Sequence, residues 1–338
     1  MLAEQLLNQV REYIRQTSLG EVLGLAKEVS VSFLAQGEYN LNYLLQSGER
    51  KYVLRINTGS QMGLDNQIAY EYQALRLLNR SQVTPRALYL DDTRAQIPYG
   101  MLVMEYLPGV PLDYRCDLTR AARTLARIHG LEYAPSEVEF LAREPGPLTG
   151  LFNEAAYLLE TFFTCQSANP RAVSLLKKII AEAEERKQDE KYLLAEPWLR
   201  VINRDVNSRN FIVNAESDEC FLIDWERPIY GEPAQDLSHF LIVTTTLWKT
   251  DYIINREEED LFIGVYADEL DPCPQAKTLQ DRVEMFKYFN LLRAVAWCAM
   301  AWTEYIKPGR PLSNQDTFQK IERYIEPEFV SSVFCQQV

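Results

Sequence analysis

Hydrophobic and polar residues alternate over residues 29–56, with turn-forming residues between three short runs. Alternation with a period of two is typical of strands that bury one face, and glycine-containing turns separate the strands of a meander. The pattern therefore predicts a three-stranded antiparallel meander. The apolar positions are Val29, Val31 and Phe33, then Leu41, Tyr43 and Leu45, then the run Tyr52 to Ile56, and the turns are Gln36-Gly37-Glu38 and Ser47-Gly48.

Helical spacing replaces this alternation on either side of the meander. Residues 1–16 carry charges between their apolar positions, which predicts an amphipathic helix and not a signal peptide. Ile68, Leu75 and Leu78 recur at helical spacing, which predicts a helix over about residues 65–80. The apolar run 99–106 predicts a buried strand that ends at Pro108-Gly109.

After Pro111 the pattern changes from strands to helices. We therefore expect an α+β fold with two lobes, a small antiparallel β lobe with one helix over residues 1–106 and a larger, mostly helical lobe over residues 107–338. The expected helices are one from Leu118 to Ile128, capped by Asp117 and followed by Gly130, then 151–193 with a break at Asn169-Pro170, and 234–306 with a break at Asp271-Pro272; short strands are expected at 199–202, 211–213 and 221–223.

Composition narrows the class of protein. The chain has 338 residues, of which 47% are hydrophobic and 25% charged, and this mix excludes a disordered, collagenous or coiled-coil chain. Acids outnumber bases by 48 to 35, for a net charge of −13. Phosphate backbones repel such a surface, so we expect no nucleic-acid partner. The same charge attracts cationic small molecules, although ordinary solubility is the preferred explanation for it.

Cysteine spacing and hydropathy indicate the cellular compartment. The six cysteines form no C-x-x-C pair, and no uncharged apolar run approaches the length of a membrane span. We therefore expect free thiols, no membrane partner and a cytoplasmic location. The sequence does not indicate which oligomeric state the protein adopts.

Several familiar catalytic motifs are missing from the sequence. There is no G-x-x-x-x-G-K-[ST], G-x-G-x-x-G, H-E-x-x-H or G-x-S-x-G. The two histidines, His129 and His239, leave almost no material for a histidine-based metal site or triad. Each is expected to be a structural helix residue.

Residues 201–228 carry the strongest chemical signal. Asp205 follows one expected strand, Asn210 begins the next, and Asp224 ends a third. Two oxygen ligands from this set could hold Mg²⁺, while the remaining carboxylate faces a substrate hydroxyl. This is the division of labour that phosphoryl transfer needs, but a plain β-hairpin with Asp and Asn as turn residues fits the segment equally well.

The first lobe favours phosphoryl transfer. The turn over residues 36–40 has the place of a loop above a nucleotide, and Arg55 supplies a cation on the third strand. Glu71 follows sixteen residues later on the expected helix, where it can position that cation. Residues 104–107 form an extended hinge whose backbone can pair with an adenine edge.

The chain resembles the aminoglycoside/choline phosphotransferase family, the small-molecule branch of the protein-kinase-like fold. That family reads H-G-D-x4-N, then I-D-W/F-E, then G-x-x-x-x-D-L, and the resemblance covers about residues 30–245. The matching residues are Asn203-Arg204-Asp205 with Asn210, Ile223-Asp224-Trp225-Glu226, Gly231 with Asp236-Leu237, and Tyr52 to Arg55 with Glu71.

The resemblance implies a role for each matched position. It implies a small-molecule kinase that uses ATP and Mg²⁺, with Asp205 as the base or orienter of the accepting hydroxyl. Asp236 supports the catalytic loop through hydrogen bonds. Asn210 and Asp224 bind Mg²⁺, Arg55 contacts the nucleotide phosphates and is steadied by Glu71, and Glu105 and Leu107 present backbone groups to adenine.

Two residues depart from the family pattern. Asn203 replaces the loop-bracing His, and Arg204 replaces a Gly. In an active enzyme we expect Asn203 to brace the loop near Asp224, and Arg204 to point towards an acid such as Glu226 or Asp236. In the alternative, a nucleotide-binding pseudokinase that acts as a scaffold or sensor, Arg204 pairs with Asp205 and neutralises it.

The acceptor is expected to be a small molecule, possibly amine-bearing, bound between the catalytic loop and the C-terminal helices. Aromatic side chains beside acids suit an amine. The competing explanation is that the aromatic residues are core and the acids a solvated face. The candidates are Trp225, Tyr230, Trp248, Trp297 and Trp302, with the acidic runs 256–260 and 268–271.

Overall fold

The computed structural model describes residues 2–26, 28–37, 39–60, 62–307 and 315–335. Glu38, in the predicted loop above the nucleotide, lies outside the described residues. The chain forms two compact units, and each is described by itself. The predicted boundary between residues 106 and 107 stays a prediction, because compactness alone does not define a functional lobe. The first unit holds residues 1–112, 131–141 and 210–228, and the second holds 113–130, 142–209 and 229–338.

The described part of the first unit contains an antiparallel sheet of β1 (Ser30–Gln36), β2 (Asn40–Ser47), β3 (Arg50–Asn57), β4 (Ala87–Asp91) and β5 (Gly100–Glu105). The strand order is β1-β2-β3-β5-β4. The predicted meander and the predicted strand before Pro108 are thus confirmed. The sequence pattern missed β4, because all its residues are half-buried and no alternation marks them.

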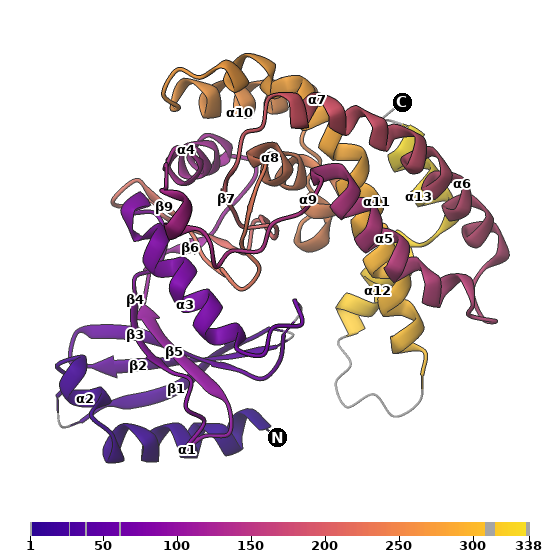
Figure 1. Ribbon diagram of the computed structural model, residues 1–338. Coiled ribbons are helices and arrows are strands. Elements are labelled where there is room, and N and C mark those ends of the chain that lie inside the picture. Colours follow the sequence, from indigo (N-terminus) through magenta and orange to yellow (C-terminus); the bar gives the residue numbers. More distant parts are fainter. Residues whose placement is uncertain (1, 27, 38, 61, 308–314, 336–338) are drawn as a thin grey trace. The chain divides into compact units, whose positions relative to one another are not determined.

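Two helices cover opposite faces of this sheet, α1 (Leu2–Gln16) and α3 (Gln67–Leu78) (Figure 1). Both were predicted. Successive residues of a strand point to opposite faces, so Leu54 and Ile56 pack in the core that α1 covers. Arg55, between them, therefore points to the face of α3. The unit also contains α2 (Leu19–Val22) and the 3-10 turns η1 (Asn79–Ser81) and η2 (Pro135–Glu137).

A smaller sheet completes the first unit, with β6 (Val110–Pro111), β8 (Phe211–Asn214) and β9 (Glu219–Leu222) in the order β6-β8-β9. Gly109 enters β6 with a φ of 147°, and a Cβ there would lie 2.4 Å from the carbonyl oxygen of Val213. Only glycine allows both this backbone conformation and this approach.

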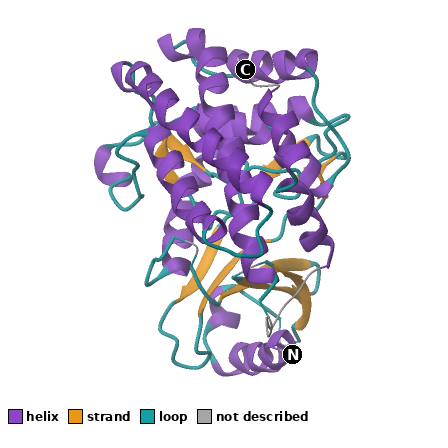
Figure 2. Cartoon of the chain, turned by 90° about the vertical axis from the view of Figure 1, so that its right-hand side faces the viewer, coloured by secondary structure: helices purple, strands orange, loops and turns teal. Residues whose placement is uncertain are grey.

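Helices make up most of the second unit, as the purple ribbon around the C-terminus in Figure 2 shows. The predicted change from strands to helices is therefore confirmed. The long helix α11 packs along α5 and α8. The helices are α4 (Leu118–His129), α5 (Pro147–Phe163), α6 (Pro170–Arg186), α7 (Glu190–Ala195), α8 (Pro233–Leu241), α9 (Val243–Lys249), α10 (Arg256–Asp268), α11 (Leu279–Tyr305), α12 (Gln315–Tyr324) and α13 (Pro327–Cys335), with the 3-10 turns η3 (Lys187–Asp189) and η4 (Pro274–Thr278).

The three predicted short strands are present but belong to two sheets. β8 and β9 pair with each other in the first unit, whereas β7 (Arg200–Ile202) pairs with β10 (Ile229–Gly231) in the second. The two-residue β6 and the three-residue β10 are too short to leave a sequence pattern. Within the described ranges no helix has the length and apolarity to cross a membrane.

Helix starts were predicted with mixed success. Asn169 accepts a hydrogen bond from the N–H of Arg171, and so caps α6 where the sequence breaks. Asp117 precedes α4 as expected, but its carboxylate makes no capping bond. It accepts instead from the backbone of Asp113 and from the guanidinium of Arg120.

The approach of Gly109 to β8 yields a stability test. Gly109→Ala should lower the free energy of unfolding by about 2–4 kcal/mol, since it adds backbone strain and a collision with the Val213 carbonyl. The control is Gly48→Ala, where φ is +61° and nothing lies within 4 Å, so only about 1 kcal/mol should be lost. Urea unfolding measures both. Equal losses would show that the close approach carries no cost.

Candidate active site

Arg55 is the centre of a buried ion cluster in the first unit. Its guanidinium donates to Glu71 on α3 and, over 2.9 Å, to Asp224 after β9. Its Nε donates to Asn42 on the neighbouring strand over 3.0 Å. The side chains of Arg55 and Glu71 are 8% and 1% exposed, while that of Asp224 is 29% exposed. The structure thus brings together three residues predicted for the site.

Burial and charge act against each other in this cluster. Burial by itself would lower the pKa of Arg55, but the carboxylates of Glu71 and Asp224 raise it above its usual value. Burial raises the pKa of Glu71, and the positive charge of Arg55 opposes that rise. Arg55 therefore remains cationic in a place with little water, where a charge acts strongly on a phosphate.

Asn210 and Asp224 lie on paired backbone segments. The N–H of Ile223 donates to the carbonyl of Asn210 over 2.7 Å, where β8 and β9 begin to pair. Asp224 then turns out of the ladder with a φ of 64°. Over the described residues no group of three His, Cys, Asp or Glu side chains gathers as a metal cage. One carboxylate and one amide fit Mg²⁺, which takes its remaining ligands from phosphate and water.

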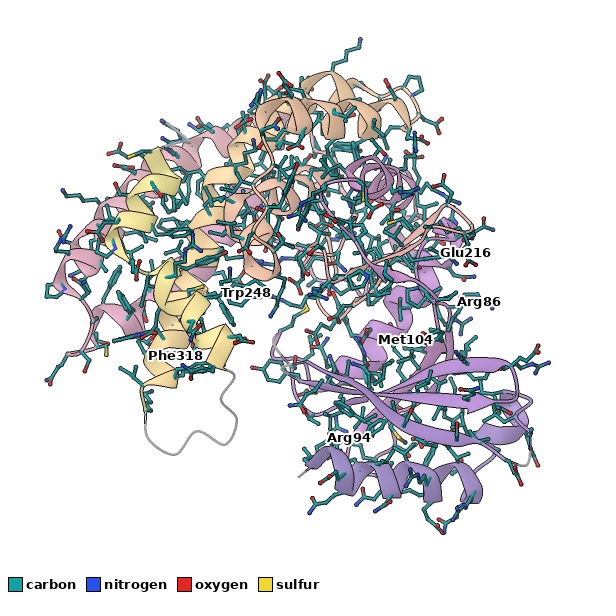
Figure 3. The ribbon with its side chains drawn as sticks, turned by 180° about the vertical axis from the view of Figure 1, so that it is seen from behind. Arg86, Arg94, Met104, Glu216, Trp248 and Phe318 are labelled. Atoms are coloured by element: carbon teal, nitrogen blue, oxygen red, sulfur yellow. The ribbon has the colours of Figure 1, made fainter. Side chains whose placement is uncertain are left out.

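The predicted hinge follows β5. The carboxylate of Glu105 accepts two hydrogen bonds from the Arg86 guanidinium, at 3.1 and 3.2 Å, and its backbone N–H donates to the carbonyl of Arg86. Figure 3 labels Arg86 together with Met104, the neighbour of Glu105 on β5. Leu107 is half-buried in the irregular stretch after the strand. Backbone groups beyond the strand end remain the predicted contacts to adenine.

Asp205 lies in the second unit, in the loop after β7. The fully buried carboxylate of Asp236 on α8 accepts the backbone N–H groups of Asn203 and Arg204, at 2.7 and 2.8 Å. The Asn203 side chain accepts the N–H of Asp205 over 3.0 Å. The predicted support by Asp236 is confirmed, and Asn203 braces the loop locally. A bond from Asn203 to the backbone near Asp224 stays a prediction.

Arg204 takes partners other than the expected ones. Its guanidinium lies 3.2 Å from Glu144 and 2.8 Å from Glu154. The expectation that Arg204 points towards an acid is therefore confirmed. The acids that its side chain contacts are Glu144 and Glu154, not the suggested Glu226 or Asp236. Both actual partners lie more than 45 residues before it, so no local pattern could identify them.

The backbone conformation of Arg204 explains why the family that the sequence resembles has glycine at this position. Its φ is 69°, in the left-handed region that disfavours a Cβ. The N–H bond to Asp236 and the ion pairs of the side chain hold the residue in that conformation.

Two more residues of the second unit contact the loop after β7 and were not predicted to do so. The hydroxyl of Tyr114 accepts the N–H of Ser208 over 3.2 Å, and burial raises the pKa of Tyr114 to about 12, so the hydroxyl stays neutral. Arg293 on α11 donates to the carbonyl of Arg204 over 3.1 Å. Tyr114 lies between predicted elements and Arg293 inside a long helix, so neither stood out in the sequence.

His129 has the structural role expected of it. It is fully buried in α4, with Nδ1 3.0 Å from the Tyr266 hydroxyl and Nε2 3.4 Å from Asp236. It therefore packs behind the carboxylate that supports the loop.

Trp225, one of the acceptor candidates, packs in the core instead. It is fully buried in the first unit, and its indole N–H donates to the carbonyl of Leu222 over 2.9 Å. A fully buried ring cannot line an acceptor site, so the core explanation holds for this residue.

The other aromatic candidates are half-buried in the second unit and make ring contacts. Trp248, labelled in Figure 3, packs edge-on against Trp297. Trp302 packs edge-on against Phe162, and Arg143 lies over the ring of Tyr230. Core packing thus accounts for part of each ring.

The acidic run 256–260 serves helix capping and ion pairing. Glu258 and Asn255 form a reciprocal cap at the start of α10. Glu259 pairs with Lys287 over 2.7 Å. These contacts favour a structural role for the run.

The structures of known proteins share the fold. A choline kinase from Streptococcus pneumoniae has 20% sequence identity and a TM-score of 0.58, over 95% of this chain and 99% of that one. A choline kinase from Cryptosporidium parvum has 14% identity and a TM-score of 0.63, over 97% and 96%. An ADP-bound aminoglycoside phosphotransferase has 14% identity and a TM-score of 0.59, over 95% and 97%. The predicted protein-kinase-like fold is confirmed.

Comparison with curated proteins finds no match. The model of the phosphotransferase enzyme family, in contrast, matches residues 30–270, which include every residue predicted to bind the nucleotide or the metal and the predicted catalytic residue Asp205. The resemblance inferred from the motifs and the prediction of a kinase-type enzyme are thereby confirmed. With most of its length matched, the chain belongs to the phosphotransferase enzyme family.

Proposed function

We propose that the protein transfers the γ-phosphoryl group of ATP, with Mg²⁺, to a hydroxyl of a small molecule. The observation that carries the proposal is the contact of Arg55 with both Glu71 and Asp224. A strand cation held by a helix carboxylate, with a second carboxylate beside it, is the arrangement that phosphoryl transfer uses to orient nucleotide phosphates.

Each residue has one task in this proposal. Arg55 binds phosphate oxygens, and Glu71 holds its guanidinium in place. Asn210 and Asp224 are the residues that would hold Mg²⁺, which when bound neutralises charge on the β- and γ-phosphates. Asp205 orients the accepting hydroxyl and takes its proton.

Adenine is proposed to bind at the hinge. Glu105 ends β5 with its carboxylate bound by Arg86, so in this proposal the adenine edge pairs with backbone groups of Glu105 and Leu107. Adenine recognition through backbone groups needs no particular side chain at these positions, in agreement with the half-buried Leu107.

The pseudokinase alternative requires Arg204 to pair with Asp205. The guanidinium of Arg204 pairs with Glu144 and Glu154 instead, and it is 8% exposed. This arrangement supports an enzyme, because Glu144 and Glu154 hold the guanidinium that the alternative needs for an ion pair with Asp205.

We propose an amine-bearing alcohol as the first acceptor class to test. The net charge of −13 attracts cations, and the neighbours named above act on choline or on aminoglycosides. ATP consumption should be screened over choline, ethanolamine, aminoglycosides, homoserine, methylthioribose and sugars. Stimulation by no acceptor would contradict the proposal.

Nucleotide binding can be tested without an acceptor. ATP with Mg²⁺ should raise the melting temperature, because a ligand that binds only the native state stabilises it, by about 2.7 kcal/mol at a hundred times its dissociation constant. ATP with excess EDTA is the control and should give a smaller rise. Equal shifts with and without free metal would contradict the role of Mg²⁺.

The role of Asp205 predicts a change in turnover. Asp205→Asn should lower kcat by roughly a hundredfold or more, the range for loss of a positioned base, with the KM for ATP little changed. The control is Asp281→Asn, an exposed carboxylate in the first turn of α11, which should leave kcat unchanged. An unaltered turnover number in Asp205→Asn would remove Asp205 from the mechanism.

The role of Asp224 predicts a change in metal dependence. Asp224→Asn should raise the Mg²⁺ concentration for half-maximal turnover by about tenfold or more, because it removes the charge of one ligand. Asn tolerates the left-handed φ of 64°, so the backbone is retained. Asp218→Asn is the control, since Asp218 is exposed with a φ of 56°. Identical Mg²⁺ titrations for both variants would contradict the assignment of Asp224 as a Mg²⁺ ligand.

A further inference from the structure

The peptide group between Arg204 and Asp205 is held by two partners, and the peptide group before it is held by a third. The N–H of Asp205 donates to Asn203, and the N–H of Arg204 donates to Asp236. The carbonyl of Arg204 accepts from Nη2 of Arg293 over 3.1 Å. A peptide group is planar, so a bond to this carbonyl also fixes the direction from which the backbone enters Asp205.

Arg293 reaches this carbonyl from inside the helical unit. It lies on α11 and is 8% exposed. Glu154 on α5 lies 2.8 Å from the guanidinium of Arg204 and 3.8 Å from that of Arg293. One carboxylate therefore connects the side chain of Arg204 to the residue that holds its backbone.

A buried guanidinium is costly unless it is paired and hydrogen-bonded. Arg204 adds a second cost, because the left-handed backbone conformation is unfavourable for a residue with a Cβ. Without an opposing contact, the loop would relax towards an ordinary φ and turn the peptide before Asp205. The bond from Arg293 opposes that rotation directly.

We propose that Arg293 is a positioning residue for Asp205, which acts by holding the carbonyl of Arg204, with Glu154 orienting both guanidinium groups. The inference rests on the proposed function of Asp205 as the base. Arg293 touches neither the nucleotide nor the acceptor in this proposal, so its effect should fall on turnover and not on binding of ATP.

The test compares two buried cations on the same helix. Arg293→Met should lower kcat by about ten- to a hundredfold, the range for a misplaced catalytic group, with the KM for ATP within about twofold. Lys287→Met is the matched control, because Lys287 is 2% exposed and pairs with Glu259 and Glu284, away from the loop. It should lower the melting temperature but leave kcat unchanged. Arg293→Lys keeps a donor and a charge, and should recover part of kcat.

A second measurement does not depend on activity. Hydrogen exchange of the peptide 203–209 should be faster in Arg293→Met than in wild type, and unchanged in Lys287→Met. Equal exchange in the two variants, or an equal fall of kcat, would overturn the proposal. If wild type transfers phosphate to no acceptor, the proposed function fails, while the exchange comparison still decides whether Arg293 holds the loop.

Discussion

The first unit depends on one buried cation. A guanidinium that is 8% exposed must have partners, and Arg55 finds them on three separate segments, namely β2, α3 and the turn after β9. Removing any one partner would leave buried charge without compensation, which costs several kcal/mol. The ion cluster therefore fixes where α3 and Asp224 lie relative to the sheet. In the proposed function, the same contacts hold the guanidinium of Arg55 in place before a phosphate binds.

The second unit also depends on a buried charge, in this case an anion. Asp236 has no exposed surface, and its two oxygens accept the N–H groups of Asn203 and Arg204. Charge-assisted bonds of this kind are stronger than those between neutral groups. They hold the loop before Asp205 in a conformation that Arg204 would not choose alone. Each unit thus uses a buried charge to fix the backbone or side chain on which the chemistry depends.

Much of this structure could be predicted from local patterns in the sequence. The period of two predicted the meander. The pairing of Arg55 with Glu71 was predicted from the arrangement that phosphoryl transfer needs, a cation on the third strand and an acid on the next helix. The strands β6 and β10 were too short to leave a sequence pattern, and the ion pairs of Arg204 join segments far apart in the chain. The place of Trp225 could not be decided from the sequence, because an aromatic residue beside such a motif looks the same whether it packs in the core or lines a cleft.

Arg204 shows why a single departure from a family pattern is hard to interpret in isolation. Glycine adopts a φ of 69° without strain and needs no side-chain partner. Arginine at the same position needs its backbone held and its charge paired, and Glu144, Glu154 and Arg293 meet both needs. The departure therefore involves at least four positions on three segments. Because those contacts draw the guanidinium towards Glu144 and Glu154, an exchange that suggested a neutralised Asp205 is compatible with a working carboxylate.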